Sequence, residues 1–289
     1  MPYDCIVLAK QVPDTKAVGA NAMNPDGTVN RAALPAVFNP EDLNALELAL
    51  QIRDIYGGSV TVITMGLPKA CDILREALYR GADRVILLTD RRAAASDTLA
   101  TSYILSCAIR RLARYDLILC GRQAIDGDTA QVGPQVAEKL HLPQVTYVEK
   151  LESLDGMTLT VRRNIGAGWE RLRVNLPVLL TVMDIANQPR PAGAKRLMKY
   201  KKAQAPAELG PSPDPATLDH LGRRGLLIEQ WNLDDVCADL RWCGRDGSPT
   251  KVHRIQSVVL RASGFKQVSP TDDGIRRLVH ELIEDHTIG

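Results

Sequence analysis

Residues 117–132 combine residue types and spacing that could bind a ligand; they read Leu-Ile-Leu-Cys-Gly-Arg-Gln-Ala-Ile-Asp-Gly-Asp-Thr-Ala-Gln-Val. The first four residues are an apolar run typical of a buried parallel strand, which Gly121 ends. Small and polar residues follow, and a helical pattern runs from about Thr129 to Leu140. We therefore predict a strand, a tight turn and a helix start in this stretch.

The predicted turn could hold phosphate. Asp128 or Thr129 can cap the helix, which leaves free backbone N–H groups at the end of the strand. Ligands of parallel α/β sheets bind at the carboxyl ends of the strands, and a helix N-terminus there favours phosphate. An ordinary strand-to-helix turn, in which Asp126 and Asp128 only shape the turn and cap the helix, explains the pattern equally well at this point.

Strands and helices alternate in the sequence before this stretch. Apolar runs predict strands at 5–9, 60–65 and 85–88. Helices are expected to begin at Asn39, after Pro68 and at Ser96. Asn39 should cap its helix, with proline at the first helical position and two acidic residues in the first turn. This strand–helix order predicts an α/β fold with a parallel-core sheet and flanking helices.

The sequence after residue 140 changes to short strands joined by turns. Three segments, 145–151, 158–163 and 171–174, have strand character, and an Asp-Gly turn at 155–156 favours a hairpin. Residues 178–182 form one more apolar strand. We expect the sheet to gain antiparallel edge strands here.

Composition and charge limit the class of protein. At 289 residues, the chain could form one large α/β domain or one domain with a smaller extension. The net charge of +2 argues against nucleic acid as a partner, and no window is apolar enough to insert into a membrane. The N-terminus shows no basic region or cleavage site, and six scattered cysteines include no C-x-x-C pair. We expect a cytoplasmic protein.

Beyond Asp184 the pattern is less sheet-like. Residues 187–202 are basic, with lysines and arginine clustered from Lys195 onward, and a solvated surface is the simplest interpretation. Four prolines between 206 and 215 predict an extended linker. We expect a nucleotide-binding α/β domain over 1–202, and a linker with a C-terminal arm that wraps a partner over 203–289. The arm should include a strand at 258–260 and a helix at 272–285.

Several catalytic and nucleotide-binding motifs are absent from the sequence. It contains no G-x-x-x-x-G-K-[ST] loop, no G-x-G-x-x-G after the first strand and no adenylating pyrophosphatase loop. Its five histidines have no metal-site spacing, and only 4% of the residues are aromatic. The pattern indicates a nucleotide-binding protein without an acid–base catalytic constellation.

The sequence resembles the β subunit of electron-transfer flavoprotein. The matching motifs cover roughly residues 3–202 and occur in the family's order. They are Lys10-Gln-Val-Pro-Asp-Thr15, Phe38-Asn-Pro-Glu-Asp42, Gly81-Ala-Asp-Arg84, Cys120-Gly-Arg-Gln-Ala-Ile-Asp-Gly-Asp-Thr129, Leu176-Pro177, Asn187-Gln-Pro-Arg190 and Met198-Lys-Tyr-Lys-Lys202. The resemblance implies an adenine nucleotide alpha hydrolase-like, Rossmann-like fold and an α-subunit partner that carries FAD.

The resemblance also implies a nucleotide site at strand ends and helix starts. In the family this site holds AMP in ordinary members and a second FAD in electron-bifurcating ones. Carried over residue by residue, it comprises Leu8, Asn39, Pro40, Glu41, Asp42, Met65, Gly121, Arg122, Gln123, Ala124, Ile125, Asp126, Gly127, Asp128, Thr129, Ala130, Gln131 and Val132. Thr129, Gln131 and main-chain N–H groups are the expected phosphate partners.

Three motifs favour FAD over AMP, because they resemble the bifurcating branch. They are Lys10-Gln-Val-Pro-Asp-Thr15, Asp126-Gly-Asp-Thr-Ala-Gln-Val-Gly-Pro134 and Gly247-Ser-Pro-Thr250 with Val252. Gly127 would also leave room for the close approach of backbone to ligand. We therefore expect FAD, with AMP as the alternative. Such a flavin takes an electron pair from NADH and sends single electrons to acceptors of high and low potential.

The implied partner surface departs from the family at one position. Ala194 stands where the family presents a leucine that anchors onto acyl-CoA dehydrogenases, and Lys195 follows it. Another dehydrogenase or a quinone-linked oxidoreductase is then the expected partner. Glu170 matches a family glutamate that pairs with an α-subunit arginine, although a solvated hairpin residue explains it equally well. An adenine-nucleotide-binding regulatory protein without a redox role stays open as an alternative of another class.

Overall fold

The computed structural model describes residues 1–14, 35–112, 114–251 and 267–284, which fall into two units. The first unit contains the described residues up to 251, and the second contains the described residues from 267 onward. The described residues of the second unit include one helix, α8 (Asp272–Glu284), none of whose residues is buried. The turn expected at 24–27 and the strand expected at 258–260 lie outside the described residues.

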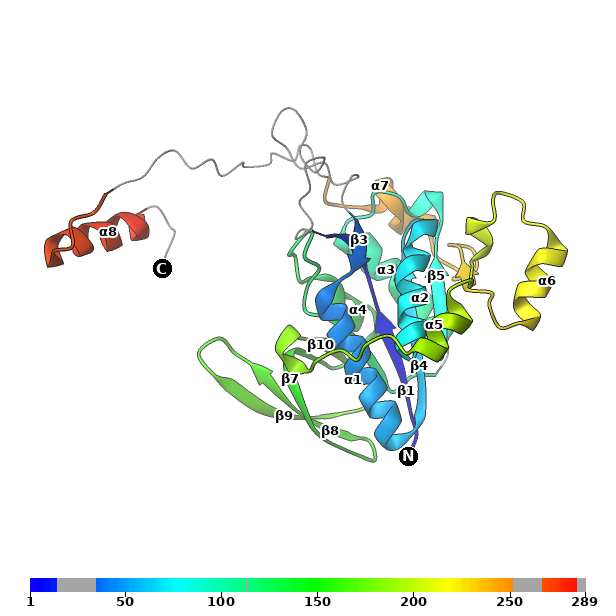
Figure 1. Cartoon of the computed structure of the whole chain (residues 1–289), viewed down its shortest axis with the longest axis horizontal. Helices are drawn as coiled ribbons and strands as arrows, with labels where there is room; N and C mark the ends of the chain where they lie inside the picture. Colours follow the sequence, from blue (N-terminus) through cyan, green and yellow to red (C-terminus); the bar gives the residue numbers. More distant parts are fainter. Residues whose placement is uncertain (15–34, 113, 252–266, 285–289) are drawn as a thin grey trace. The chain divides into compact units, whose positions relative to one another are not determined.

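A sheet flanked by helices forms the centre of the first unit (Figure 1). It has nine strands in the order β11-β5-β4-β1-β6-β10-β7-β8-β9. Every neighbouring pair from β11 to β7 is parallel, whereas β8 and β9 are added antiparallel at one edge. The expected α/β fold with a parallel core and antiparallel edge strands is thus confirmed. The strands are β1 (Tyr3–Leu8), β4 (Gly58–Met65), β5 (Arg84–Leu88), β6 (Leu117–Gly121), β7 (Gln144–Asp155), β8 (Thr158–Asn164), β9 (Trp169–Asn175), β10 (Val178–Val182) and β11 (Glu229–Trp231).

Two pairs of helices cover the two faces of the parallel core. Side chains of α1 (Pro40–Tyr56) and α2 (Cys71–Arg80) pack with Cys5 and Val7 of β1 in one hydrophobic cluster. Those of α3 (Thr98–Arg111) and α4 (Val132–Leu140) pack with the alternate residues of β1 in the other cluster. Since successive side chains of a strand point to opposite faces, burial on both faces explains why the central strands are continuous apolar runs.

Shorter elements complete the first unit. They are the antiparallel pair β2 (Gln11–Pro13) and β3 (Ala36–Phe38), the helices α5 (Ala194–Tyr200), α6 (Pro215–Arg223) and α7 (Gly244–Gly247), and five 3₁₀ turns in the described residues, at 68–70, 91–93, 184–186, 206–208 and 240–242. In the part of the chain that the structure describes, no helix is long and apolar enough to cross a membrane, and no His, Cys, Asp or Glu cluster could hold a metal ion.

The sheet and its core continue past residue 202, where we expected the nucleotide-binding domain to end. The strand β11 pairs in parallel with β5, and its Trp231 is buried. Residues 203–210 are not an extended linker, because Ala205 is fully buried and Glu208 forms an ion pair with Arg75 of α2 at 3.0 Å. The partner-wrapping role of the C-terminal region stays a prediction.

Candidate functional site

A cavity of about 660 Å³ opens at the carboxyl ends of the central strands. Leu8, Met65 and Gly121, the last residues of β1, β4 and β6, all line it. This is the position at which parallel α/β sheets bind ligands, and the volume is in the range of small-molecule sites. Leu8, Asn39, Asp42, Met65 and every residue of 121–132 except Ile125 line the cavity, whereas Pro40, Glu41 and Ile125 do not.

Asn39 supports the loop that forms one wall of this cavity. It occupies the N-cap position of α1, but its side chain makes no capping hydrogen bond, so the cap expected from the sequence is wrong. Instead Nδ2 donates to the carbonyl of Gln123 at 2.9 Å, and Oδ1 accepts from the backbone N–H of Ile125 at 3.2 Å. The fully buried amide of Asn39 therefore fixes the middle of the loop.

The two acidic residues in the first turn of α1 also bind this part of the chain. Glu41 accepts from the backbone N–H of Gln123 at 2.9 Å and pairs with the Arg122 guanidinium at 2.8 Å. Asp42 accepts from the backbone N–H groups of Gly121 and Lys10, at 2.7 and 2.9 Å. Burial raises the pKa of Asp42 to about 7, against the opposite effect of these hydrogen bonds. The first turn of α1 therefore joins the ends of β1 and β6.

The loop 121–132 contains strained backbone next to the cavity. Asp128 and Ala130 have φ values of +48° and +51°, a region that residues other than glycine rarely adopt. The helix α4 begins at Val132, later than expected, and neither Asp128 nor Thr129 caps it. The side chain of Asp128 accepts from Gln123 Nε2 at 2.9 Å instead. Such strain is often found at binding sites, and the uncapped start of α4 offers backbone donors to an anion.

The start of α3 forms another wall, which the sequence analysis did not assign to the site. Asp97 caps this helix by accepting from the backbone N–H of Ala100 at 2.9 Å. Thr98 donates through Oγ1 to Gln131 Oε1 at 2.7 Å and so links α3 to the loop before α4. Further lining residues missed from the sequence are Ala9, Lys10, Ser96, Thr101, Leu105, Cys120 and Gly133. The sequence did signal the helix start at Ser96, and helices that follow parallel strands begin at the same edge of the sheet.

The segment that includes 247–250 is attached to this wall. Ser248 Oγ accepts from the backbone N–H of Asp97 at 2.9 Å. The backbone N–H of Thr250 donates to Asp97 Oδ2 at 2.9 Å. A motif that lies more than a hundred residues away in the sequence is therefore in contact with a residue that lines the cavity.

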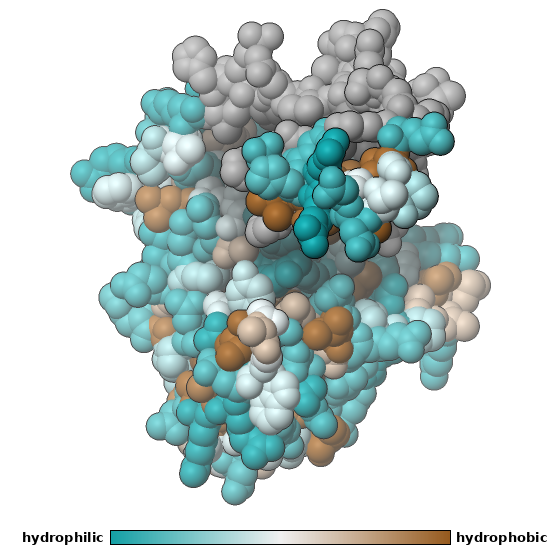
Figure 2. Space-filling model, turned by 90° about the vertical axis from the view of Figure 1, so that its left-hand side faces the viewer, coloured by the Kyte–Doolittle hydropathy of each residue, from teal (hydrophilic) through white to brown (hydrophobic). Residues whose placement is uncertain are grey.

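The expected partner-binding residues lie elsewhere on the first unit. Ala194 and Lys195 are exposed at the start of α5. Glu170 is on the edge strand β9, where its partly exposed carboxylate lies 3.3 Å from the Arg163 guanidinium of β8. On the face drawn in Figure 2, hydrophobic surface occurs as separate patches among hydrophilic residues, so hydropathy does not mark one large contact area there.

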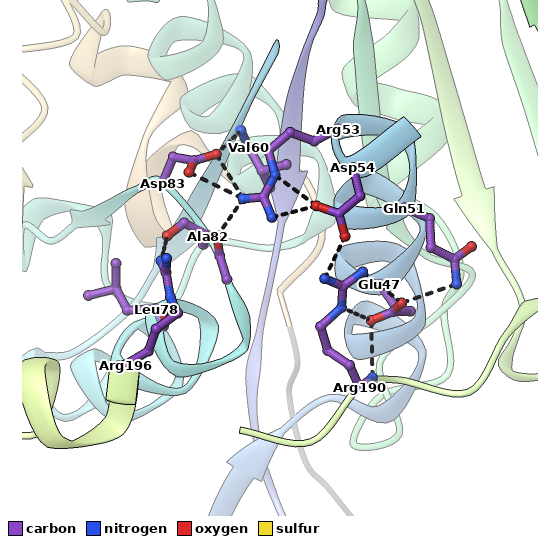
Figure 3. Close-up of polar contacts among 11 residues, drawn as sticks. Glu47, Gln51, Arg53, Asp54, Val60, Leu78, Ala82, Asp83, Arg190 and Arg196 are labelled. Carbon is purple, nitrogen blue, oxygen red and sulfur yellow. Dashed lines mark hydrogen bonds and ion pairs between the residues drawn. The ribbon is translucent and has the colours of Figure 1, made fainter. Parts of the chain in front are cut away.

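Two arginines hold the segment before and within α5 onto α1 and α2 (Figure 3). Arg190 forms ion pairs with Glu47 and Asp54 of α1, each at 2.8 Å. Arg196 donates to the carbonyls of Leu78 and Ala82, at the end of α2. The carboxylate of Glu47 is almost completely buried, so its charge-assisted bonds to Arg190 attach this segment firmly to α1.

Comparisons with known proteins identify the family. The model of the electron transfer flavoprotein domain matches residues 26–208. The β subunit of electron transfer flavoprotein from Clostridium acetobutylicum is 41% identical to this chain and covers 98% of it and 99% of its own length. The chain belongs to the electron transfer flavoprotein β-subunit family.

Other members of the family show its range. Protein FixA of Sinorhizobium fredii is 38% identical, over 96% of this chain and 91% of its own. Subunit CarD of the caffeyl-CoA reductase–Etf complex of Acetobacterium woodii is 39% identical, over 98% of this chain and 99% of its own length. Members of the electron transfer flavoprotein family thus include the subunit of a larger reductase complex.

Proposed function

We propose that this electron transfer flavoprotein β subunit binds FAD in the cavity bounded by the loop 121–132 and passes electrons, as a bifurcating subunit, between NADH or a dehydrogenase and further acceptors. The observation that carries the proposal is the cavity itself. It lies at the carboxyl ends of three parallel strands and is bordered by the uncapped start of α4. FAD would supply the redox chemistry, and Asn39, Thr98 and Gln131 would position the walls that hold it.

A second cavity supports FAD over AMP. It has a volume of about 960 Å³, is lined by residues after β4 and β5, and shares Met65 with the first cavity. A ligand longer than AMP therefore has space at the same edge of the sheet. The open environment of Gly127, with no atom within 4 Å of an added Cβ, is consistent with close approach of a ligand to the loop.

We infer that the chain works in a heterodimer with an electron-transfer flavoprotein α subunit. The helix α8 is amphipathic, with Ile275, Leu278, Val279 and Leu282 at the spacing of one helical face. An arm of this kind suits a partner-wrapping role. The six unpaired cysteines suit a reducing compartment, so we place the complex in the cytoplasm.

The redox partner is proposed to be a dehydrogenase or a quinone-linked oxidoreductase other than a conventional acyl-CoA dehydrogenase. Ala194 exposes only a methyl group at the start of α5, where the family's anchor is a leucine. The alternative is an ordinary β subunit that holds structural AMP and serves acyl-CoA dehydrogenases, and the first cavity alone would suffice for AMP.

The nucleotide content of the purified heterodimer tests this proposal. The chain is co-expressed with its α subunit, the complex is precipitated with acid, and the released FAD and AMP are counted per heterodimer. Two FAD molecules without AMP are expected. One FAD with one AMP would contradict the bifurcating role and favour the ordinary carrier. One FAD per heterodimer without AMP, which is the content of the α subunit alone, would contradict a nucleotide-binding role for the cavity.

A further inference from the structure

Lys10 and Asp126 form an ion pair at the wall of the cavity. Lys10 Nζ lies 2.7 and 2.9 Å from the two carboxylate oxygens of Asp126. The backbone of Lys10 is fixed on both sides, because its N–H donates to Asp42 and its carbonyl accepts from the N–H of Asn39. Its side chain is half exposed, so the ammonium group can exchange partners without movement of the backbone.

Among the described lining residues, Lys10 is the more exposed of the two cations, with 50% of its side chain exposed against 27% for Arg122. The lining contains four carboxylates, Asp42, Asp97, Asp126 and Asp128, against two cations, Lys10 and Arg122. The Arg122 guanidinium pairs through Nη2 with the buried carboxylate of Glu41 and lies near the Tyr147 ring, and its Nε is buried without a hydrogen-bond partner among the described residues. Without a free cation, a phosphate in this cavity would face net negative charge.

Asp126 differs from the other three carboxylates in what it binds. Asp42 accepts hydrogen bonds from the backbone N–H groups of Lys10 and Gly121, at the ends of β1 and β6. Asp97 accepts from the backbone N–H groups of Ala100 and Thr250. Asp128 accepts from Gln123 within the loop. The hydrogen bonds of the Asp126 carboxylate to described residues all come from the ammonium of Lys10. Among the described residues, Asp126 is therefore held at the cavity wall by Lys10.

We propose that Lys10 binds the ligand's phosphate and that Asp126 is a built-in competitor which the phosphate displaces. The inference rests on the proposed nucleotide site and adds to it the residue that recognises phosphate and the residue that limits its affinity. An exposed ion pair is weak, whereas a hydrogen bond from ammonium to phosphate is charge-assisted, so the exchange favours the bound ligand. The carboxylate keeps Lys10 paired when no nucleotide is bound.

The proposal is tested by calorimetric titration of the heterodimer with AMP and with FAD. The nucleotide bound to the β subunit is removed beforehand. Asp126→Asn should tighten AMP binding by roughly three- to fivefold, because it removes the competitor. Lys10→Gln should weaken AMP binding by roughly tenfold or more, and Asp126→Asn should have no effect in the Lys10→Gln background. Adenosine, which lacks phosphate, should bind equally to all forms.

The two substitutions should change AMP affinity in opposite directions, which distinguishes this role from a structural one. If the ion pair only shapes the loop, both variants will weaken AMP and adenosine binding alike, and the proposal is overturned. Glu229→Gln, which removes the charge from the similarly exposed Arg84–Glu229 pair on β5 and β11, is the control and should not alter binding. If the unmodified heterodimer binds neither AMP nor FAD, the proposed function fails as well, which is a distinct result.

Discussion

Asp42 Oδ1 accepts a hydrogen bond from the backbone N–H of Gly121 at 2.7 Å, and a Cβ atom added to Gly121 would lie 2.7 Å from the same oxygen. The close approach joins the first turn of α1 to the end of β6. Asn39, three positions before Asp42, holds the loop that follows Gly121. The start of α1 is thus the support of the candidate nucleotide site.

Gly121→Ala should lower the free energy of unfolding by about 1–3 kcal/mol, because the added methyl group would overlap the side chain and backbone of Glu41 as well as Asp42. Urea denaturation gives the value. Gly127→Ala is the matched control, since its Cβ meets no atom within 4 Å, and its effect should stay below about 0.5 kcal/mol. Equal stability of the two variants would show that the contact at Gly121 relaxes freely.

Asp90, in the loop after β5, should make the stability of the folded chain fall at low pH. The hydrogen bonds from the Arg92 side chain lower the pKa of Asp90 to about 2, and Asp90 also accepts from the backbone N–H of Leu233. Since the folded pKa is below the unfolded value of about 3.9, the stabilisation is present above pH 4 and is lost as the pH falls towards 2.

Asp90→Asn should therefore reduce the loss of stability between pH 4 and pH 2 by roughly 1 kcal/mol, after allowance for screening of this partly exposed pair. Thermal unfolding at a series of pH values measures it. An unchanged pH dependence in the variant would mean that Asp90 does not contribute.

The sequence predicted the site's elements better than the roles of its side chains. The pattern Asn39-Pro-Glu-Asp42 correctly marked a helix start, but the Asn39 side chain bonds the loop at 123–125 instead of capping. Lys10 was missed as a lining residue because its partner, Asp126, is 116 positions away. The strand β11 has only three residues, too few to show a period, and its place beside β5 depends on tertiary packing.

The proposal that Ala194 stands in place of the family's leucine anchor leads to a gain-of-affinity prediction. Ala194→Leu should strengthen docking to a conventional acyl-CoA dehydrogenase by about 1–3 kcal/mol, the free energy of burying the larger side chain. The dependence of dehydrogenase turnover on flavoprotein concentration measures it as a lower KM. Ala192→Leu, at a neighbouring exposed alanine, is the control. A KM that is the same for both variants would argue against a docking role of position 194.

The central claim is that the loop 121–132 forms a flavin site. It is tested most directly by measuring the FAD content of two variant heterodimers, one with Asn39→Ala and one with Asn44→Ala. Both asparagines are buried, Asn39 just before α1 and Asn44 within it, but Asn44 bonds Asp184 and Asn187 and does not line the cavity. Loss of the buried hydrogen bonds from Asn39 to Gln123 and Ile125 should lower the free energy that holds the loop 121–132 in place by about 1–3 kcal/mol, and so release the loop. The account predicts one FAD per heterodimer for Asn39→Ala and two for Asn44→Ala. Two FAD molecules in both would contradict it.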